Sequence, residues 1–350
     1  MFGFKAKVSP VASHDAARVH GVERQKFRAG DRVVVRSAQE ILSTLDADGT
    51  LHGLPFMPEM LEWCGKPYTI QRRAEKTCVD VSPESGINPH RRFAGDDVVF
   101  LDGPRCGGQG HDGCKRACKM FWKEDWLRAF DPADSSAHAS ESGLDVHLPR
   151  LKTKVEADRY FCQSTQLFTA TEAFPGKMKP WILRIIVREI RNGDRSVLEI
   201  LQLLVLWAWR RLIRVATGRA WVRGPNERIT PSVSLGLEPG EIVRFKSSAD
   251  MVATLNHKGK NRGMGFCAEM TRFCGGQAEV MHRCDRIINE RTGKMREIKD
   301  TVTLKNMRTA TPLLPNSECL CFDVLGDCAR GDPMMWREIW LTRASASSGN

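Results

Sequence analysis

The sequence has no block of five or more charges of one sign, although its formal net charge is +11 and its pI is about 9.2. Acidic and basic residues alternate instead, as they do between Asp285 and Arg291. A positive balance permits an acidic partner such as nucleic acid or anionic lipid. Interspersed charges, however, are typical of a solvated surface. We therefore keep nucleic-acid binding only as an alternative.

Sequence features of export and of membrane insertion are also missing. The N-terminal residues Met1 to Lys7 contain no apolar segment of the kind that a secretory signal carries. The apolar run from Leu203 to Trp209 is much shorter than the roughly 20 residues of a transmembrane helix. Disulfide scaffolds belong mainly to small secreted chains. We therefore expect the 12 cysteines of these 350 residues to be reduced, in a cytoplasmic protein with no transmembrane span.

Two common catalytic patterns are absent. The glycines between Gly107 and Gly110 lack the Lys-Ser/Thr pair that a phosphate-binding loop needs. No Ser/His/Asp grouping can be recognised either. The sequence therefore names no reaction.

What the chain does contain is an internal duplication. Residues 30–65 and 240–275 align without a gap at an offset of 210, and 12 of the 36 aligned pairs are identical. The match extends, with small insertions, to Trp122–Leu127 and Trp336–Leu341. About two domains are also expected from the length of 350 residues.

Each copy predicts a small β-rich module. The segments 31–36, 68–72 and 97–101 are rich in β-branched and aromatic residues, which predicts strands. We expect an α+β fold in which two tandem SH3-like, partly open barrels are joined by a helical insert. The expected divisions are a leader at 1–26, module one at 27–130, a flexible linker at 131–180, the helical insert at 181–218 and module two at 236–345.

The helical insert is strongly apolar. Ser196 and Glu199 form a capping-box pattern at the start of its second helix, and Gly218 is the expected end. The apolar residues cover all sides of this helix. Burial between the modules or in a homodimer contact through 197–213 is the plain interpretation. Peripheral membrane contact and a groove for a lipid or acyl ligand remain alternatives.

The cysteines carry the clearest chemical signal. Three thiols and an imidazole lie within 13 residues on a glycine-rich loop, and thiolates are strong ligands for zinc or iron. Three cysteine positions recur in both copies, and ligands of one ion must converge. The first predicted metal site consists of Cys64, Cys106, Cys114 and Cys118, with His111 as a substitute ligand.

The second predicted site is less complete. It consists of Cys274, Cys319 and Cys328, with Cys321 or His282 as the fourth ligand. Cys118 corresponds to Asp332, so this site would be rearranged, open or empty. Zinc is the expected metal and iron the alternative. Buried free thiols and a catalytic metal with an open position are the competing interpretations. Cys78, Cys162, Cys267 and Cys284 have no counterpart in the other copy and are interpreted as core or surface thiols.

Several polar residues recur as well. Glu59 and Glu124 could act as a general base near the metal, and Asp332 could mark an open site. Arg73 recurs as Arg283, so a structural ion pair between arginine and glutamate is the favoured interpretation. A motif present in both halves serves folding more often than chemistry.

The strings Phe-x-x-Glu-Met…Cys-Gly and Trp-[Lys/Arg]-Glu-x-Trp-Leu resemble a family of bacterial proteins encoded among biosynthetic genes for natural products or surface polysaccharides. The resemblance covers both modules and the segment 188–204, and it implies tandem modules joined by a helical segment. No activity is established for that family, so the resemblance assigns no catalytic residue.

These patterns lead to one functional hypothesis and two alternatives. We expect a metal-stabilised tandem-repeat protein with a binding or accessory role in a bacterial biosynthetic pathway. Its ligand, a small molecule or a protein of that pathway, would lie between the modules. The alternatives are a metal-dependent biosynthetic enzyme with an open cysteine-ligated site and a basic nucleic-acid-binding protein.

Overall fold

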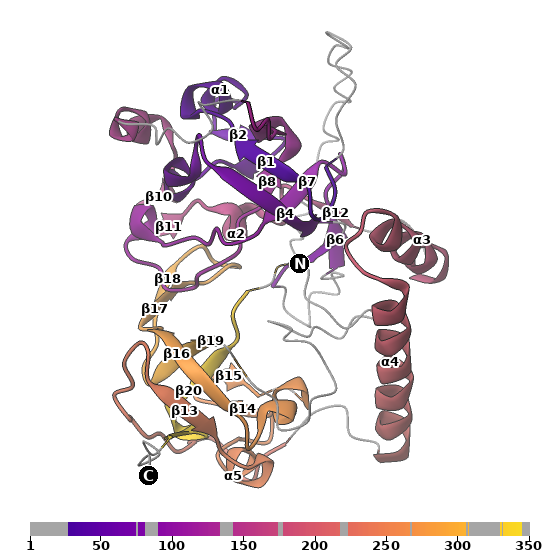
Figure 1. The fold of residues 1–350 in the computed structure, drawn as a ribbon. Helices are drawn as coiled ribbons and strands as arrows, with labels where there is room; N and C mark the ends of the chain where they lie inside the picture. Colours follow the sequence, from indigo (N-terminus) through magenta and orange to yellow (C-terminus); the bar gives the residue numbers. More distant parts are fainter. Residues whose placement is uncertain are drawn as a thin grey trace, which may run out of the picture.

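Two five-stranded antiparallel sheets, one in each half of the chain, form the framework of the molecule (Figure 1). The computed structural model describes residues 27–74, 76–80, 90–133, 143–173, 178–217, 223–266, 268–305, 307, 330 and 332–344. The first sheet has the order β8-β7-β4-β1-β9, and the second has the order β20-β19-β16-β13-β21. Each strand of one sheet therefore has a counterpart in the other.

The strands of the first sheet are β1 (Arg32–Val35), β4 (Pro67–Arg73), β7 (Val98–Leu101), β8 (Trp122–Lys123) and β9 (Leu127–Ala129). Those of the second are β13 (Ile242–Phe245), β16 (Gln277–Arg283), β19 (Thr301–Lys305), β20 (Met335–Arg337) and β21 (Leu341–Arg343). Short strand pairs flank them: β2 (Thr50–Leu51) with β3 (Leu54–Pro55), β10 (Lys154–Glu156) with β11 (Arg159–Tyr160), β14 (Lys260–Asn261) with β15 (Met264–Gly265), and β17 (Arg286–Ile288) with β18 (Met295–Glu297). A three-stranded sheet contains β5 (Thr77–Cys78), β6 (His90–Arg92) and β12 (Glu172–Ala173).

The α-helices are α1 (Ala38–Ser43), α2 (Gln163–Gln166), α3 (Met178–Arg191), α4 (Val197–Thr217) and α5 (Ser248–Ala253). The 3₁₀ helices include η1 (Pro58–Trp63), η3 (Gln109–His111), η4 (Glu124–Trp126), η6 (Leu144–Arg150), η7 (Ala268–Phe273) and η8 (Glu338–Trp340). The Ser-x-x-Glu pattern at Ser37 and Glu40 forms a capping box at the start of α1: the Glu40 amide donates to Ser37 Oγ at 3.3 Å, and the Ser37 amide donates to the Glu40 carboxylate at 2.9 Å.

The two cores are separate but are built alike. In the first, the Trp126 ring meets Phe56 edge-on at 5.3 Å and its Nε1 donates to Thr44 Oγ1. In the second, Trp340 meets Phe266 at 5.3 Å and donates to Thr254 Oγ1. Since a buried indole N–H needs a hydrogen-bond partner, each threonine meets this need in the same way. Residues predicted as linker also join the first core, namely Leu151, Cys162 and Leu167.

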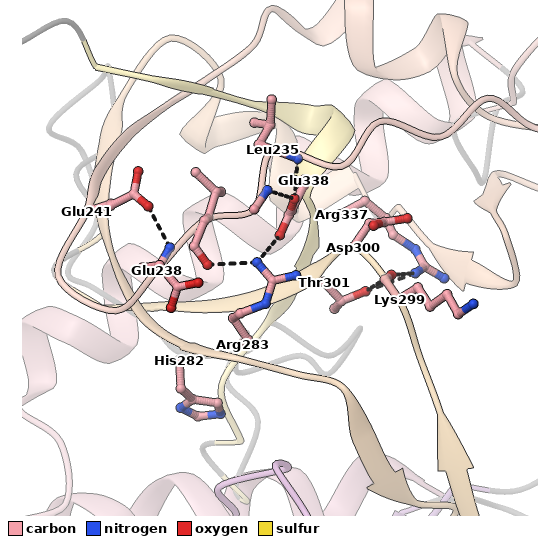
Figure 2. A network of polar contacts seen from close by, with 12 residues as sticks. Leu235, Glu238, Glu241, His282, Arg283, Lys299, Asp300, Thr301, Arg337 and Glu338 are labelled. Atoms are coloured by element: carbon pink, nitrogen blue, oxygen red, sulfur yellow. Dashed lines mark hydrogen bonds and ion pairs between the residues drawn. The ribbon is translucent and has the colours of Figure 1, made fainter.

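A recurring acid, buried in the first half as Asp97 and partly exposed in the second as Asp300, is neutralised differently in the two halves. Asp97 accepts from Lys123 Nζ at 2.9 Å, and His52 Nδ1 lies 3.7 Å away. The corresponding Asp300 pairs with Arg262 at 2.6 Å. The counterpart of Lys123, Arg337, donates instead to the Lys299 carbonyl and Thr301 Oγ1 (Figure 2). It also donates to the Arg262 carbonyl.

The expected α+β fold of two partly open barrels joined by a helical insert is wrong. The sheets are open: among the described residues, no strand pairing joins β8 to β9 or β20 to β21. Only η4 or η8 separates the strands of each such pair, so the chain crosses from one edge to the other without pairing the edges.

The helices are not inserted between the modules either. Figure 1 shows α4 at the margin of the molecule, not between the sheets. The helices α3 and α4 pack on each other around Ile200, and α3 is tied to the first module by an ion pair between Arg188 and Asp96 at 2.9 Å. One face of α4 is exposed at Leu198, Leu201, Val205, Trp209 and Leu212. The homodimer contact through 197–213 stays a prediction.

Candidate functional site

The loop from Cys106 to Cys118 lies at the junction of the two modules. The Lys115 amide donates to the Arg286 carbonyl at 2.9 Å. The Lys115 carbonyl accepts from His282 Nε2 at 2.9 Å and from the Cys284 thiol at 3.1 Å. The loop of module one is therefore bound to β16 and β17 of module two at several backbone positions.

The conformation of this loop depends on left-handed backbone positions. Gly108 has φ +72°, and a Cβ placed there would lie 2.1 Å from the Cys114 carbonyl oxygen. Asp112 and Ala117 also have positive φ values. The Cys106 amide donates to the Cys118 carbonyl at 2.9 Å, which closes the loop at its base. Gly108 therefore allows the close approach of the Cys114 carbonyl, and the bond between Cys106 and Cys118 holds the two ends of the thiol-bearing segment together.

Four thiols line one cavity at this junction. Cys106, Cys114 and Cys118 come from the loop, and Cys162 comes from the residue before α2. The cavity has a volume of about 500 Å³, counting the part open to solvent. Its remaining lining includes apolar residues of module one and residues of module two, among them Met57, Phe121, Ile288 and Arg330.

Burial favours the protonated form of two of the cavity thiols, Cys106 and Cys118. Burial raises the pKa of Cys118 to about 12, and the negative charge of Asp332 raises this pKa as well. The positive charges of Arg116 and Arg330 lower it. Burial, with the Glu59 charge and the neighbouring thiols, also holds the pKa of Cys106 well above its usual range. Because a thiolate is the reactive form of cysteine, these side chains are poorly suited to nucleophilic catalysis.

The predicted ligand His111 is engaged at both ring nitrogens. Nδ1 lies 2.7 Å from the Glu59 carboxylate, and Nε2 lies 3.0 Å from the Phe161 carbonyl oxygen. Burial opposes a charge on the ring, but the hydrogen bond to Glu59 and its charge raise the pKa of His111 above its usual value. A ring that makes both contacts has no free lone pair for a metal.

The structure separates Cys64 from the other predicted ligands. Cys64 is 1% exposed within the first hydrophobic core, and its thiol lies 3.8 Å from the Met60 carbonyl oxygen. It does not line the cavity. Among the described residues, no three His, Cys, Asp or Glu side chains already stand in an arrangement that could hold a metal ion. The thiols therefore surround the cavity without meeting at a point.

Most of the second predicted site lies outside the described residues, namely Cys319, Cys321 and Cys328. Cys274 is half-buried, with its thiol 4.0 Å from Met251 Sδ. His282 belongs to the junction, where it contacts Lys115.

The catalytic candidates Glu59, Glu124 and Asp332 all take part in ion pairs. Glu124 pairs with the buried Arg73, which also donates to the Phe27 carbonyl. Glu338 and Arg283 repeat this pair at 2.9 Å, and Figure 2 shows Glu338 also accepting from the amide of Leu235. In both halves the pair fixes the segment that precedes the first strand, as a structural ion pair would.

Asp332 belongs to a buried charge cluster beside the cavity. Arg330 donates to Glu290 at 2.6 Å and lies 3.3 Å from Asp332. Arg116, from the thiol loop, pairs with Glu290 at 3.1 Å. Arg330 also donates to Ser164 Oγ at the start of α2. The cluster therefore links both modules to the segment that contains Cys162.

Sequence reasoning missed Cys162 and Arg330 as members of this site. Cys162 has no counterpart in the other copy, so a search for recurring cysteines excludes it. The local Cys-x-Ser-Thr pattern at the start of α2 is its only signal.

No protein-family model matches the chain, and neither a curated protein nor a solved structure matches it. In the part of the chain that the structure describes, no helix is both long and apolar enough to cross a membrane.

Proposed function

We propose that the chain is a metal-stabilised binding protein with an accessory role in a bacterial biosynthetic pathway. The observation that carries this proposal is the junction cavity, because residues of both modules line it together with four thiols. A soft metal such as zinc is the partner that clustered thiols favour. None of the described cysteines forms a disulfide with another described cysteine, which supports the proposal that the protein is reduced.

The arrangement of the carboxylates favours binding over catalysis. A general base must lie within reach of a substrate. Glu59 and Glu124 are buried and hold His111 and Arg73, and Asp332 lies between two arginines. Their positions therefore support a structural role, and the proposed ligand is a small molecule or protein of the pathway.

Metal analysis of the full-length, reduced protein tests this proposal. We expect about one equivalent of zinc or iron, and its removal by a chelator should lower the unfolding temperature until the metal is restored. Absence of stoichiometric metal would refute the proposal. If the metal-free protein kept its unfolding temperature while a pathway step stopped, a metal enzyme would replace the binding protein.

A further inference from the structure

The four cavity thiols come from two chain segments that the fold brings together. Cys106 and Cys118 are neighbours at the closed base of the loop, next to the bridge between Arg105 and Lys119. Cys114 lies within the same loop, and Cys162 lies 44 positions after Cys118 in the chain. All four line the same cavity, so the set differs from the predicted one by the exchange of Cys64 for Cys162.

Backbone groups act on three of the four sulfur atoms. Those of Gly108 lower the pKa of Cys106, and those of Ser164 and Thr165 lower the pKa of Cys162, both against the effect of burial. The Ile288 amide of module two donates to Cys114 Sγ at 3.4 Å. Hydrogen bonds of this kind stabilise a sulfur atom that carries negative charge.

We propose that Cys106, Cys114, Cys118 and Cys162 together bind one thiolate-held metal centre, zinc or ferrous iron, at the module junction. This inference rests on the proposed function and specifies its ligands. Binding would release four protons to solvent while four sulfur–metal bonds form, with no change of oxidation state. Four thiolates and a divalent ion carry a net charge of −2, which the nearby Arg116 and Arg330 partly offset beside Cys118.

The sulfur atoms do not yet meet in the described arrangement, so metal binding requires their side chains to turn toward one another. Each lies on a side chain with a single rotatable χ1, and a change of staggered well moves a sulfur atom by roughly 3 Å. Inside the cavity, about 30 Å³ is open to the centre of a water-sized group, which is room for one ion between the thiols.

The same loop carries the contacts to module two, so the metal would also couple the modules. Lys115 bonds to Arg286 and Cys284, and Arg116 bonds to Glu290. Both residues lie between Cys114 and Cys118 in sequence. If two ends of this short segment are bound to one metal, its backbone is held in the conformation that contacts module two.

Cys162→Ser and Cys64→Ser, made in the full-length chain, test the ligand set. We expect Cys162→Ser to lose most of its zinc or iron and the charge-transfer absorption that thiolates give with added Co²⁺. Cys64→Ser is the matched control, since it also removes a buried thiol of module one, and it should keep both signals. Loss of metal in folded Cys64→Ser with full retention in Cys162→Ser would overturn the ligand set but leave the proposed function standing. Metal-free wild-type protein would overturn both.

Alkylation of the wild-type protein gives a second measurement that does not depend on the folding of a variant. Chelation should increase the alkylation rate of Cys106, Cys114, Cys118 and Cys162 at least tenfold, as read by mass spectrometry of peptides. The half-exposed Cys78 should react equally with and without chelator. Equal rates at the four cavity thiols in both conditions would overturn the ligand assignment.

Discussion

The repeated Arg–Glu pair allows each half of the chain to serve as a control for the other. Glu124→Gln and Glu338→Gln remove the same charge from corresponding positions. Removing one partner of a buried ion pair costs about 3–5 kcal/mol, because the other charge stays buried without compensation. The arginine that remains differs in its access to water: the Arg73 side chain is 4% exposed and that of Arg283 is 35% exposed.

We therefore expect Glu124→Gln to lower the free energy of unfolding of its module by about 4 kcal/mol, and Glu338→Gln by about 3 kcal/mol, because Arg283 can be rehydrated. Hydrogen exchange read by mass spectrometry reports each module separately. Peptides from β1 and β4 should exchange roughly a thousandfold faster in the first variant, and peptides from β13 and β16 roughly a hundredfold faster in the second.

The exposed pair of Glu156 and Arg159 provides the control, since Glu156→Gln should change the free energy of unfolding by less than about 1 kcal/mol. If Glu338→Gln destabilised its module as much as Glu124→Gln does, burial of the arginine would not determine the cost.

Three further predictions follow from the junction. Gly108→Ala should lower the unfolding temperature far more than Gly113→Ala, because both have similar positive φ values but a Cβ at Gly113 has no heavy atom nearer than 3.9 Å; equal effects would exclude the steric clash. In metal-free protein, the contribution of His111 to stability should be complete below about pH 6.5 and should be lost as pH rises through its raised folded-state pKa; denaturation of His111→Gln should lack this dependence, and an unchanged pH profile would contradict the assignment. Glu290→Gln should loosen the junction, since Glu290 binds both Arg116 and Arg330, and solution X-ray scattering should show a larger radius of gyration; an unchanged radius would mean that the backbone contacts suffice.

Local features of the fold could be predicted from sequence because they depend on neighbouring residues. The Ser37–Glu40 and Ser196–Glu199 capping patterns both form, as hydrogen bonds across three positions require no tertiary context. The prediction of two partly open barrels was wrong because a barrel depends on pairing between the edge strands of a sheet. The apolar pattern of the sequence does not encode that pairing. The position of α3 and α4 depends on contacts such as that between Arg188 and Asp96, far apart in sequence.

Only part of the candidate site could be predicted from the sequence. The loop cysteines 106, 114 and 118 were recognised by their spacing and do line one cavity. Cys64 recurs in the second copy, yet its neighbours show that the recurring feature is core packing beside Met60. Cys162 has no counterpart in the other copy, and only the fold brings it to the cavity. A search for cysteines that recur in both copies therefore misses it.

Asp97 and Asp300 occupy corresponding positions but pair with different cations, and this limits which residues can be exchanged between the two halves. Asp97 depends on Lys123, whereas Asp300 depends on Arg262, and Arg337 serves backbone carbonyls instead. A chimera that grafted only position 123 or only position 337 would therefore bring in a cation whose partners stayed behind in the other half. After the duplication the two halves diverged, so each acid now depends on the residues of its own half. An exchange between the halves must therefore move the acid and its partners together.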